Sequence, residues 1–171
     1  MSRMCLFSAT LAFAVLTIST AAADPLLTKA QIAKAAQKID ACLNKQYQAT
    51  GGQATKCIGM IKGACDDAIS AGGEAAHATC SDNETAVWDV LLNKAWSELP
   101  DDLGPKRFAV LKDVQKLWLY YRTAKCGFLN DLENPGAWGM MLSADCRMDE
   151  TARRTIELRD ILGDPNLAAP Q

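Results

Sequence analysis

Two regular apolar patterns, separated by a short break, constrain this chain more than any other feature. Between residues 81 and 126, apolar side chains recur every three or four residues, as in helices that pack one face against a core. Residues 100–105 carry prolines and a glycine at the break, and so short a connection makes the two helices antiparallel neighbours. The apolar positions are Trp88, Leu91, Leu92, Ala95, Trp96 and Leu99, then Phe108, Leu111, Val114, Trp118 and Tyr121.

The residues before the first of these helices predict where it starts. Ser81 is followed three residues later by Glu84, which is the spacing of a capping box. In that motif the serine side chain binds the third amide of the helix, and the glutamate reaches back to the serine amide. We therefore expect the helix to start at Ser81, after a short helix or loop over residues 74–80.

Helical spacing continues on both sides of this stretch, and no segment alternates as a strand does. Thr28 and Gln31 form a second capping box, which opens a helix that closes at a Gly-Gly pair, residues 51–52. A last helix over residues 138–162 follows an Asn-Pro-Gly turn at residues 134–136. Together with a helix expected over residues 55–70, these segments predict an all-α, antiparallel helical bundle of about five helices.

The segment over residues 55–70 also has helical spacing but contains two glycines. Gly59 and Gly63 each weaken a helix by roughly 1 kcal/mol relative to alanine. We expect a packing reason for them, namely that two glycines one turn apart let the backbone of a neighbouring element approach closely.

The first 23 residues have the composition of a signal peptide. Arg3 precedes an apolar stretch over residues 6–18, and three alanines at residues 21–23 supply a cleavage site. We therefore expect a signal peptide at residues 1–23, a helical domain at residues 24–163 and a disordered tail at residues 164–171. No other stretch reaches the ~18 apolar residues of a membrane span, so we expect a periplasmic or secreted protein without a membrane anchor in the mature chain.

Six cysteines remain after the signal peptide, and an even number in an exported chain indicates disulfides. Helical hairpins bring together residues equidistant from their turns, which favours three local bridges. Since Cys57 and Cys65 lie close together on one predicted helix, an exchange of their partners stays open. The local pairs are Cys42–Cys57, Cys65–Cys80 and Cys126–Cys146.

Composition and spacing argue against several function classes. A formal net charge of -2 does not suit a nucleic-acid surface. The cysteine spacing does not fit zinc, and the only histidine is His77, in a connector without a nucleophile motif. The acidic pairs at residues 66–67 and 101–102 are neighbours whose side chains point apart, unlike the facing carboxyls of a glycosidase. We expect no enzyme, no metal and no cofactor.

A set of spaced residues nevertheless resembles a known family. The pattern comprises Glu84-x3-Trp88-Asp89, Leu92-Asn93, Gln115-x2-Trp118-x2-Tyr121-Arg122-x3-Cys126, Cys146 and Thr151-x2-Arg154-x3-Leu158. It is similar to the lysozyme inhibitor LprI-like family of small exported helical proteins, over about residues 65–162. This chain departs from the family in lacking a lipid-anchor cysteine and in adding a helix that carries Cys42.

Four residues of this pattern form a candidate polar cluster. Trp118 and Arg122 are four residues apart, so they share one helix face. Gln115 and Arg154 are expected to join them in one structural network. The alternative is that Trp118 and Arg122 anchor a partner, since Trp and Arg dominate interface hot spots.

The segment over residues 127–139 is the candidate partner surface, expected as a loop. A Cys126–Cys146 bridge would hold its base and lower the cost of ordering it on binding. The alternative is that its aromatic residues cover the core. The candidate residues are Phe128, Asp131, Leu132, Glu133 and Trp138.

The resemblance implies an exported, non-enzymatic binding protein that inhibits lysozyme by blocking its substrate cleft, with lysozyme or another envelope protein as partner. The acidic residues at positions 131 and 133 would then steer a basic enzyme. The alternative is a structural or small-ligand-binding module of the cell envelope, without lysozyme activity, that holds its ligand in an apolar cavity between helices.

Overall fold

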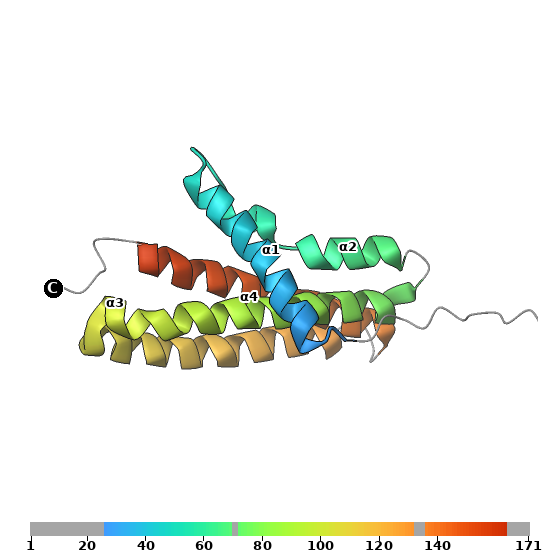
Figure 1. Ribbon diagram of the computed structural model, residues 1–171. Helices are drawn as coiled ribbons and strands as arrows, with labels where there is room; N and C mark the ends of the chain where they lie inside the picture. Colours follow the sequence, from blue (N-terminus) through green and yellow to red (C-terminus); the bar gives the residue numbers. More distant parts are fainter. Residues whose placement is uncertain (1–25, 70–71, 132–135, 164–171) are drawn as a thin grey trace, which may run out of the picture.

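The computed structural model describes residues 26–69, 72–131 and 136–163, and every regular element in these ranges is helical (Figure 1). The predicted signal peptide, the predicted tail, Leu132 and Glu133 lie outside the described residues. An all-α fold is thus confirmed. The elements are α1 (Lys29–Gln48), a 3-10 helix η1 (Ala54–Cys57), α2 (Met60–Ala68), α3 (Gly73–Asp131) and α4 (Ala137–Gly163).

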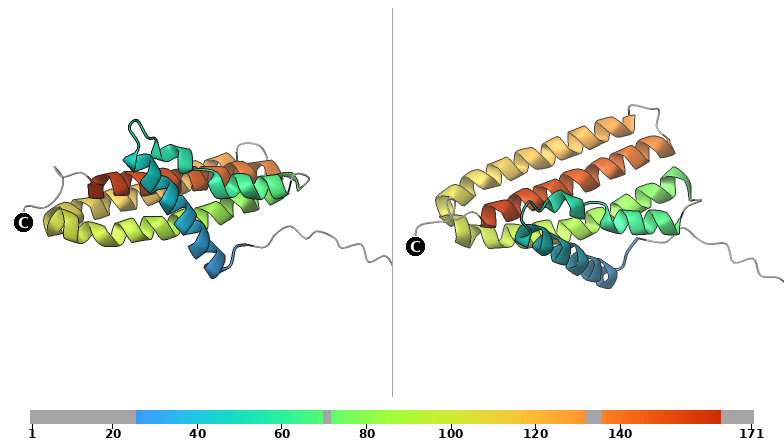
Figure 2. Two further views of the ribbon diagram at one scale, coloured as in Figure 1. Left: turned by 45° about the horizontal axis from the view of Figure 1, so that its top comes forward. Right: turned by 90° about the horizontal axis from the view of Figure 1, so that it is seen from above.

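The long helix α3 is a hairpin of two arms that meet at Gly104. This residue has φ 72° and ψ 167°, a backbone conformation that glycine adopts without strain. The arms run antiparallel and α4 packs along them (Figures 1 and 2). The expectation of about five helices is wrong, because the two helices expected here are one element and the described residues form four α-helices. A single residue makes the break, with Pro100 inside the first arm and Pro105 at the start of the second, where its missing N–H costs little.

The first arm begins at Gly73 and not at Ser81, so the predicted capping box at residues 81–84 is wrong. Ser81 lies in the middle of the helix and is fully buried. Its hydroxyl lies 3.1 Å from the carbonyl oxygen of His77, one turn earlier. Residues three positions apart also share one face of an uninterrupted helix, and Ser81 and Glu84 do so in α3.

The N-terminal elements follow the sequence prediction in part. At the start of α1, the Thr28 amide donates to Gln31 Oε1 over 2.8 Å, which confirms that capping box. The helix expected over residues 55–70 is divided into η1 and α2 by Gly59, whose φ is +86°. No neighbour lies within 4 Å of a Cβ placed at Gly59 or Gly63, so the expected close backbone approach is wrong. Gly59 is instead required by its left-handed conformation.

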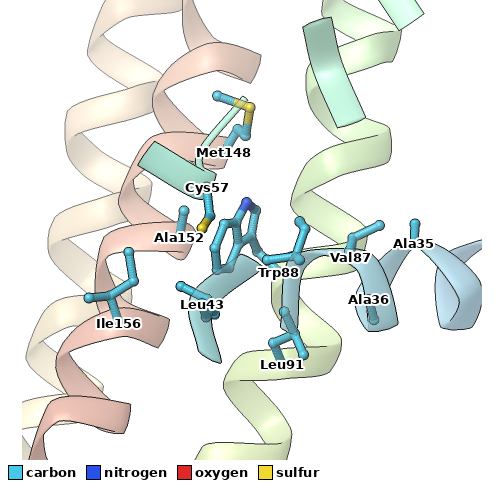
Figure 3. Close-up of a cluster of buried hydrophobic side chains, with 11 residues drawn as sticks. Ala35, Ala36, Leu43, Cys57, Val87, Trp88, Leu91, Met148, Ala152 and Ile156 are labelled. Atoms are coloured by element: carbon cyan, nitrogen blue, oxygen red, sulfur yellow. The ribbon is translucent and has the colours of Figure 1, made fainter. Parts of the chain in front are cut away.

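The core is centred on Trp88 of the first arm, which is fully buried (Figure 3). Leu43 of α1, Cys57 of η1 and Ala152 of α4 pack in the same cluster. A second cluster, around Leu99, joins the first arm to the end of α4. The predicted apolar face of the first arm is therefore confirmed.

The predicted apolar face of the second arm is wrong at two of its five positions. Val114 is 43% exposed and Tyr121 is 51% exposed, whereas Phe108, Leu111 and Trp118 are partly buried against the Leu99 cluster. The buried side of this arm is thus narrower than its apolar composition suggests.

Three disulfides join successive elements, with the local pairing expected from the cysteine spacing. The Cα–Cα distances are 5.9 Å for Cys42–Cys57, 5.6 Å for Cys65–Cys80 and 5.5 Å for Cys126–Cys146. They link α1 to η1, α2 to the first arm of α3, and the second arm to α4. Within the described residues, no helix has the length and apolar character needed to cross a membrane.

Candidate functional site

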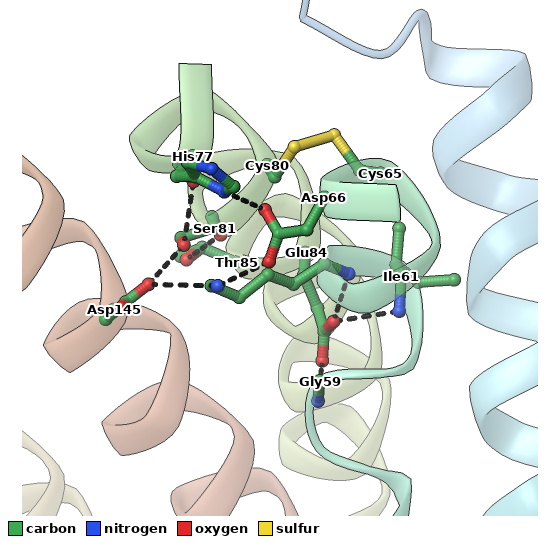
Figure 4. A network of polar contacts seen from close by, with 11 residues as sticks. Gly59, Ile61, Cys65, Asp66, His77, Cys80, Ser81, Glu84, Thr85 and Asp145 are labelled. Atoms are coloured by element: carbon green, nitrogen blue, oxygen red, sulfur yellow. Dashed lines mark hydrogen bonds and ion pairs between the residues drawn. A yellow bond between two sulfur atoms is a disulfide. The ribbon is translucent and has the colours of Figure 1, made fainter. Parts of the chain in front are cut away.

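The side chain of Glu84 binds the start of α2 from inside the protein (Figure 4). It is fully buried and accepts hydrogen bonds from three backbone amides, those of Gly59 at 2.7 Å, Ile61 at 2.9 Å and Lys62 at 2.7 Å. The indole of Trp88 donates a fourth bond, over 2.8 Å. Because the first amides of a helix lack intrahelical partners and attract negative charge, Glu84 acts as the cap that α2 otherwise lacks. The sequence pattern around Glu84 does not indicate that its partners are amides more than 20 residues earlier.

A chain of polar contacts continues from α2 to His77 (Figure 4). Asp66 accepts from Lys62 Nζ at 2.6 Å and lies 2.7 Å from His77 Nδ1. Ser81 contacts Asp145 and the backbone carbonyl of His77, not the His77 ring. The serine and histidine are therefore not arranged as a nucleophile and its base, which would require a bond between hydroxyl and imidazole.

The ion pairs around two carboxylates make stability depend on pH. Burial alone would raise the pKa of Asp66, but hydrogen bonds from Lys62 and His77 outweigh it and hold the pKa below the usual 3.8. The pKa of Asp40 is lowered in the same way, with burial opposed by the hydrogen bond and the charge of Arg159. The stabilisation from a lowered carboxyl pKa is fully present above the unfolded value and is lost as pH falls through the folded value.

We expect Asp66→Asn to lower the free energy of unfolding at neutral pH, and the gap to the wild type to close at acid pH. The gap should narrow below the usual pKa of 3.8, where the carboxylate of the unfolded chain becomes protonated, and vanish below the pKa of the folded protein. Urea unfolding of both proteins between about pH 7 and about pH 2 measures this gap. A gap that stays constant over the whole range would contradict the assignment.

The structure brings together the four residues of the candidate polar cluster. The Arg154 Nε donates to Gln115 Oε1 over 2.8 Å, joining α4 to the second arm. The guanidinium carbons of Arg122 and Arg154 lie 4.8 Å and 5.9 Å from the centre of the Trp118 ring. The Arg122 side chain is 21% exposed and that of Arg154 is 8% exposed, so a partner has little of this cluster to contact. The geometry suits the packing of α4 on α3.

The candidate partner surface lies where α3 ends and α4 begins. Residues 127–131 belong to α3 and residues 137–139 to α4, so the expectation of a loop over residues 127–139 is wrong for these positions. Phe128 is 62% exposed and Trp138 is 50% exposed, and neither is part of a buried cluster. Asp131, the last residue of α3, is exposed as well. Two exposed aromatic rings and a carboxylate thus lie at one end of the bundle.

A small hollow of about 270 Å³ lies beside this surface. Its wall includes Asn130 and Met140, which are close in sequence to Phe128 and Trp138. It also contains an ion pair in which Arg147 Nη2 donates to Asp82 Oδ1 over 2.8 Å. The two residues of this pair are 65 positions apart, so their sequence spacing could not indicate it.

A larger groove, of about 750 Å³, opens between α1, the first arm and the end of α4. The Tyr47 hydroxyl donates to Asp160 Oδ1 over 2.9 Å, and Arg159 lies over the Tyr47 ring at 5.7 Å. Burial, and then Asp160, raise the pKa of Tyr47. Sequence reasoning missed this groove, which is lined by Tyr47, Leu91, Lys94, Ala95, Glu98, Arg159, Asp160, Leu162 and Gly163.

The cysteines and acidic residues of the described part show no metal centre. The six cysteines of residues 26–163 are all in disulfides. In the same part of the chain, no group of three or more His, Cys, Asp or Glu residues is arranged to hold a metal ion.

Comparison with known proteins gives one match. A family model described as lysozyme inhibitor LprI matches residues 65–158, which is more than half of the chain. The matched stretch runs from α2 to α4 and contains Glu84, the polar cluster and two of the three disulfides. Searches of curated proteins and of solved structures found no match.

Proposed function

Because this chain belongs to the LprI family of lysozyme inhibitors, we propose that it is an exported inhibitor that blocks the substrate cleft of a lysozyme. The family match over residues 65–158 is the observation that carries this proposal. The family is generally non-enzymatic, and an inhibitor of this kind needs no chemistry of its own. Three disulfides together with the family indicate an extracytoplasmic protein, since such bridges persist in oxidising compartments.

We assign the contact with lysozyme to the end of the bundle that carries Phe128, Asp131 and Trp138. Exposed aromatic side chains supply much of the binding energy in protein interfaces. The Cys126–Cys146 bridge holds the two helix ends together, which lowers the entropy lost on binding. The hollow next to Met140 offers room for a side chain of the enzyme. Leu132 and Glu133 complete the proposed surface.

The test is a cell-wall lysis assay in which the oxidised mature chain is titrated into c-type and g-type lysozymes. We expect inhibition that saturates near one inhibitor per enzyme. Trp138→Ala should weaken it by about 2 kcal/mol, or roughly 30-fold, as for a hot-spot aromatic residue. Asp131→Lys combined with Glu133→Lys should weaken it further and remove its dependence on salt.

The control Asp101→Lys makes the same charge change as Asp131→Lys alone, at an exposed residue near the Gly104 end of the hairpin, and is compared with that single variant. It should inhibit like the wild type. Absence of inhibition by a folded sample with three disulfides would contradict the proposed function. Equal loss in Asp101→Lys would refute the proposed surface but not the function.

The groove beside Tyr47 supports a second candidate, a module that binds a small ligand. Its volume of about 750 Å³ lies within the usual range of ligand pockets. Leu91 and Leu162 give it apolar walls, and Lys94 and Arg159 give it charged groups. A small molecule retained by the purified protein, and lost in a Lys94→Glu variant that keeps the wild-type melting temperature, would favour this function over lysozyme inhibition.

A further inference from the structure

The second arm of α3 carries a row of exposed apolar residues that belongs to neither buried cluster of the described protein. Successive members are four, three, four, three and four residues apart, which is the spacing of a coiled-coil seam. We call this row the outer seam. Its members are Val110 (65% exposed), Val114 (43%), Leu117 (71%), Tyr121 (51%), Ala124 (exposed) and Phe128 (62%).

The outer seam is a second face of the arm, separate from the face that packs inside the protein. Gln115 and Cys126 are buried and point towards α4, as their bonds to Arg154 and Cys146 show. At 100° per residue, the outer seam lies roughly 150° around the helix from them. All charged side chains of the arm lie at other positions, and no seam position is charged. A narrow apolar row with strict heptad spacing fits another helix better than a broad membrane surface.

We propose that the outer seam pairs with the same seam of a second copy of this chain, with the two helices antiparallel. A two-fold axis near Leu119 places the start of the seam of one copy against the end of the seam of the other, as in an isologous interface. Large residues then meet smaller ones at each level. The pairs, each made between the two copies, are Val110 with Phe128, Val114 with Ala124, and Leu117 with Tyr121.

The exposed area is just enough for a specific dimer. Tyr120, which is 77% exposed, flanks the seam and adds to it. With about 200 Å² for each aromatic side chain and about 100 Å² for each aliphatic one, the exposed parts amount to roughly 1,000 Å² over two copies. That is close to the ~1,000 Å² that a specific interface needs, so we infer a reversible dimer.

A charge exchange across the seam tests both the pairing and its direction. Sedimentation of the full oxidised chain should show a monomer–dimer equilibrium. Leu117→Lys alone and Tyr121→Glu alone should each weaken dimerisation by at least about 30-fold, because each buries an unpaired charge. An equimolar mixture of the two variants should form a heterodimer, because residue 117 of one copy faces residue 121 of the other only when the helices are antiparallel.

The control is Ala109→Lys, which adds a charge to an exposed position on another face of the same arm. It should dimerise like the wild type, and all variants should keep the wild-type circular dichroism and melting temperature. A wild type that stays monomeric at every concentration would overturn the proposal. So would monomeric variants that fail to combine, or a monomer that binds phosphatidylglycerol vesicles through Leu117. None of these outcomes requires lysozyme. Phe128 belongs to both proposed surfaces, so the dimer and the lysozyme complex should compete.

Discussion

Glu84→Ala should lower the free energy of unfolding by about 4 kcal/mol, because it removes the only side-chain cap of α2 and leaves buried donors unpaired. Three backbone amides and the Trp88 indole currently share this carboxylate. Each unsatisfied buried donor costs about 1–3 kcal/mol, although water entering the gap would recover part of that loss. The melting temperature should fall by roughly 10 °C.

Two further variants give this prediction its controls. Glu84→Gln keeps the shape of the side chain but replaces one acceptor oxygen with a donor NH₂ group that faces backbone N–H groups, so it should also destabilise the protein. Glu98→Gln makes the same chemical change at an exposed position and should alter stability by less than about 0.5 kcal/mol. Urea unfolding followed by tryptophan fluorescence measures all three. If the free energy of unfolding of Glu84→Ala lies within about 1 kcal/mol of the wild-type value, the cap is dispensable.

Trp88→Ala should be as damaging, with a loss of about 3–5 kcal/mol, because it opens a cavity where α1, η1, α3 and α4 meet. Trp88 is fully buried and also donates to Glu84. Trp88→Phe should cost less, since it keeps most of the volume and loses the indole N–H. The losses from Trp88→Phe and Glu84→Ala should not add, because both remove the hydrogen bond from the Trp88 indole to Glu84.

The matched control for Trp88 is Trp138, which is 50% exposed. Trp138→Ala should leave the free energy of unfolding within about 0.5 kcal/mol of the wild type. The same variant should weaken lysozyme inhibition if the proposed surface is right. A Trp138→Ala protein that is strongly destabilised would contradict the exposed position of this ring.

The sequence was sufficient for features that depend on neighbours along the chain. Disulfide pairs could be predicted because the two cysteines of each pair flank one turn. Their sequence separation is 15 in the first two pairs and 20 in the third. The cap at Thr28 was predictable because both of its partners lie within one turn of the helix. The buried face of the first arm followed from its spacing, since its large buried apolar residues form one continuous stripe.

Features that depend on distant parts of the chain were missed or misassigned. The spacing of Ser81 and Glu84 fits a cap of their own helix, but Glu84 binds amides 22 to 25 residues earlier. In the second arm, apolar residues occupy two faces, and spacing could not tell which one is buried. The candidate surface at the end of the bundle remains a prediction, and the Asp82–Arg147 pair beside it could not be predicted, because its residues come from two helices far apart in sequence.

The hydrogen bonds of Glu84 reach beyond the stretch that matches the family model. The family match begins at Cys65, whereas the amides bound by Glu84 belong to Gly59, Ile61 and Lys62. A chain cut at the family boundary would keep a fully buried carboxylate and lose three of its four donors. In this chain, residues before the matched stretch are thus needed to pair a buried side chain inside it.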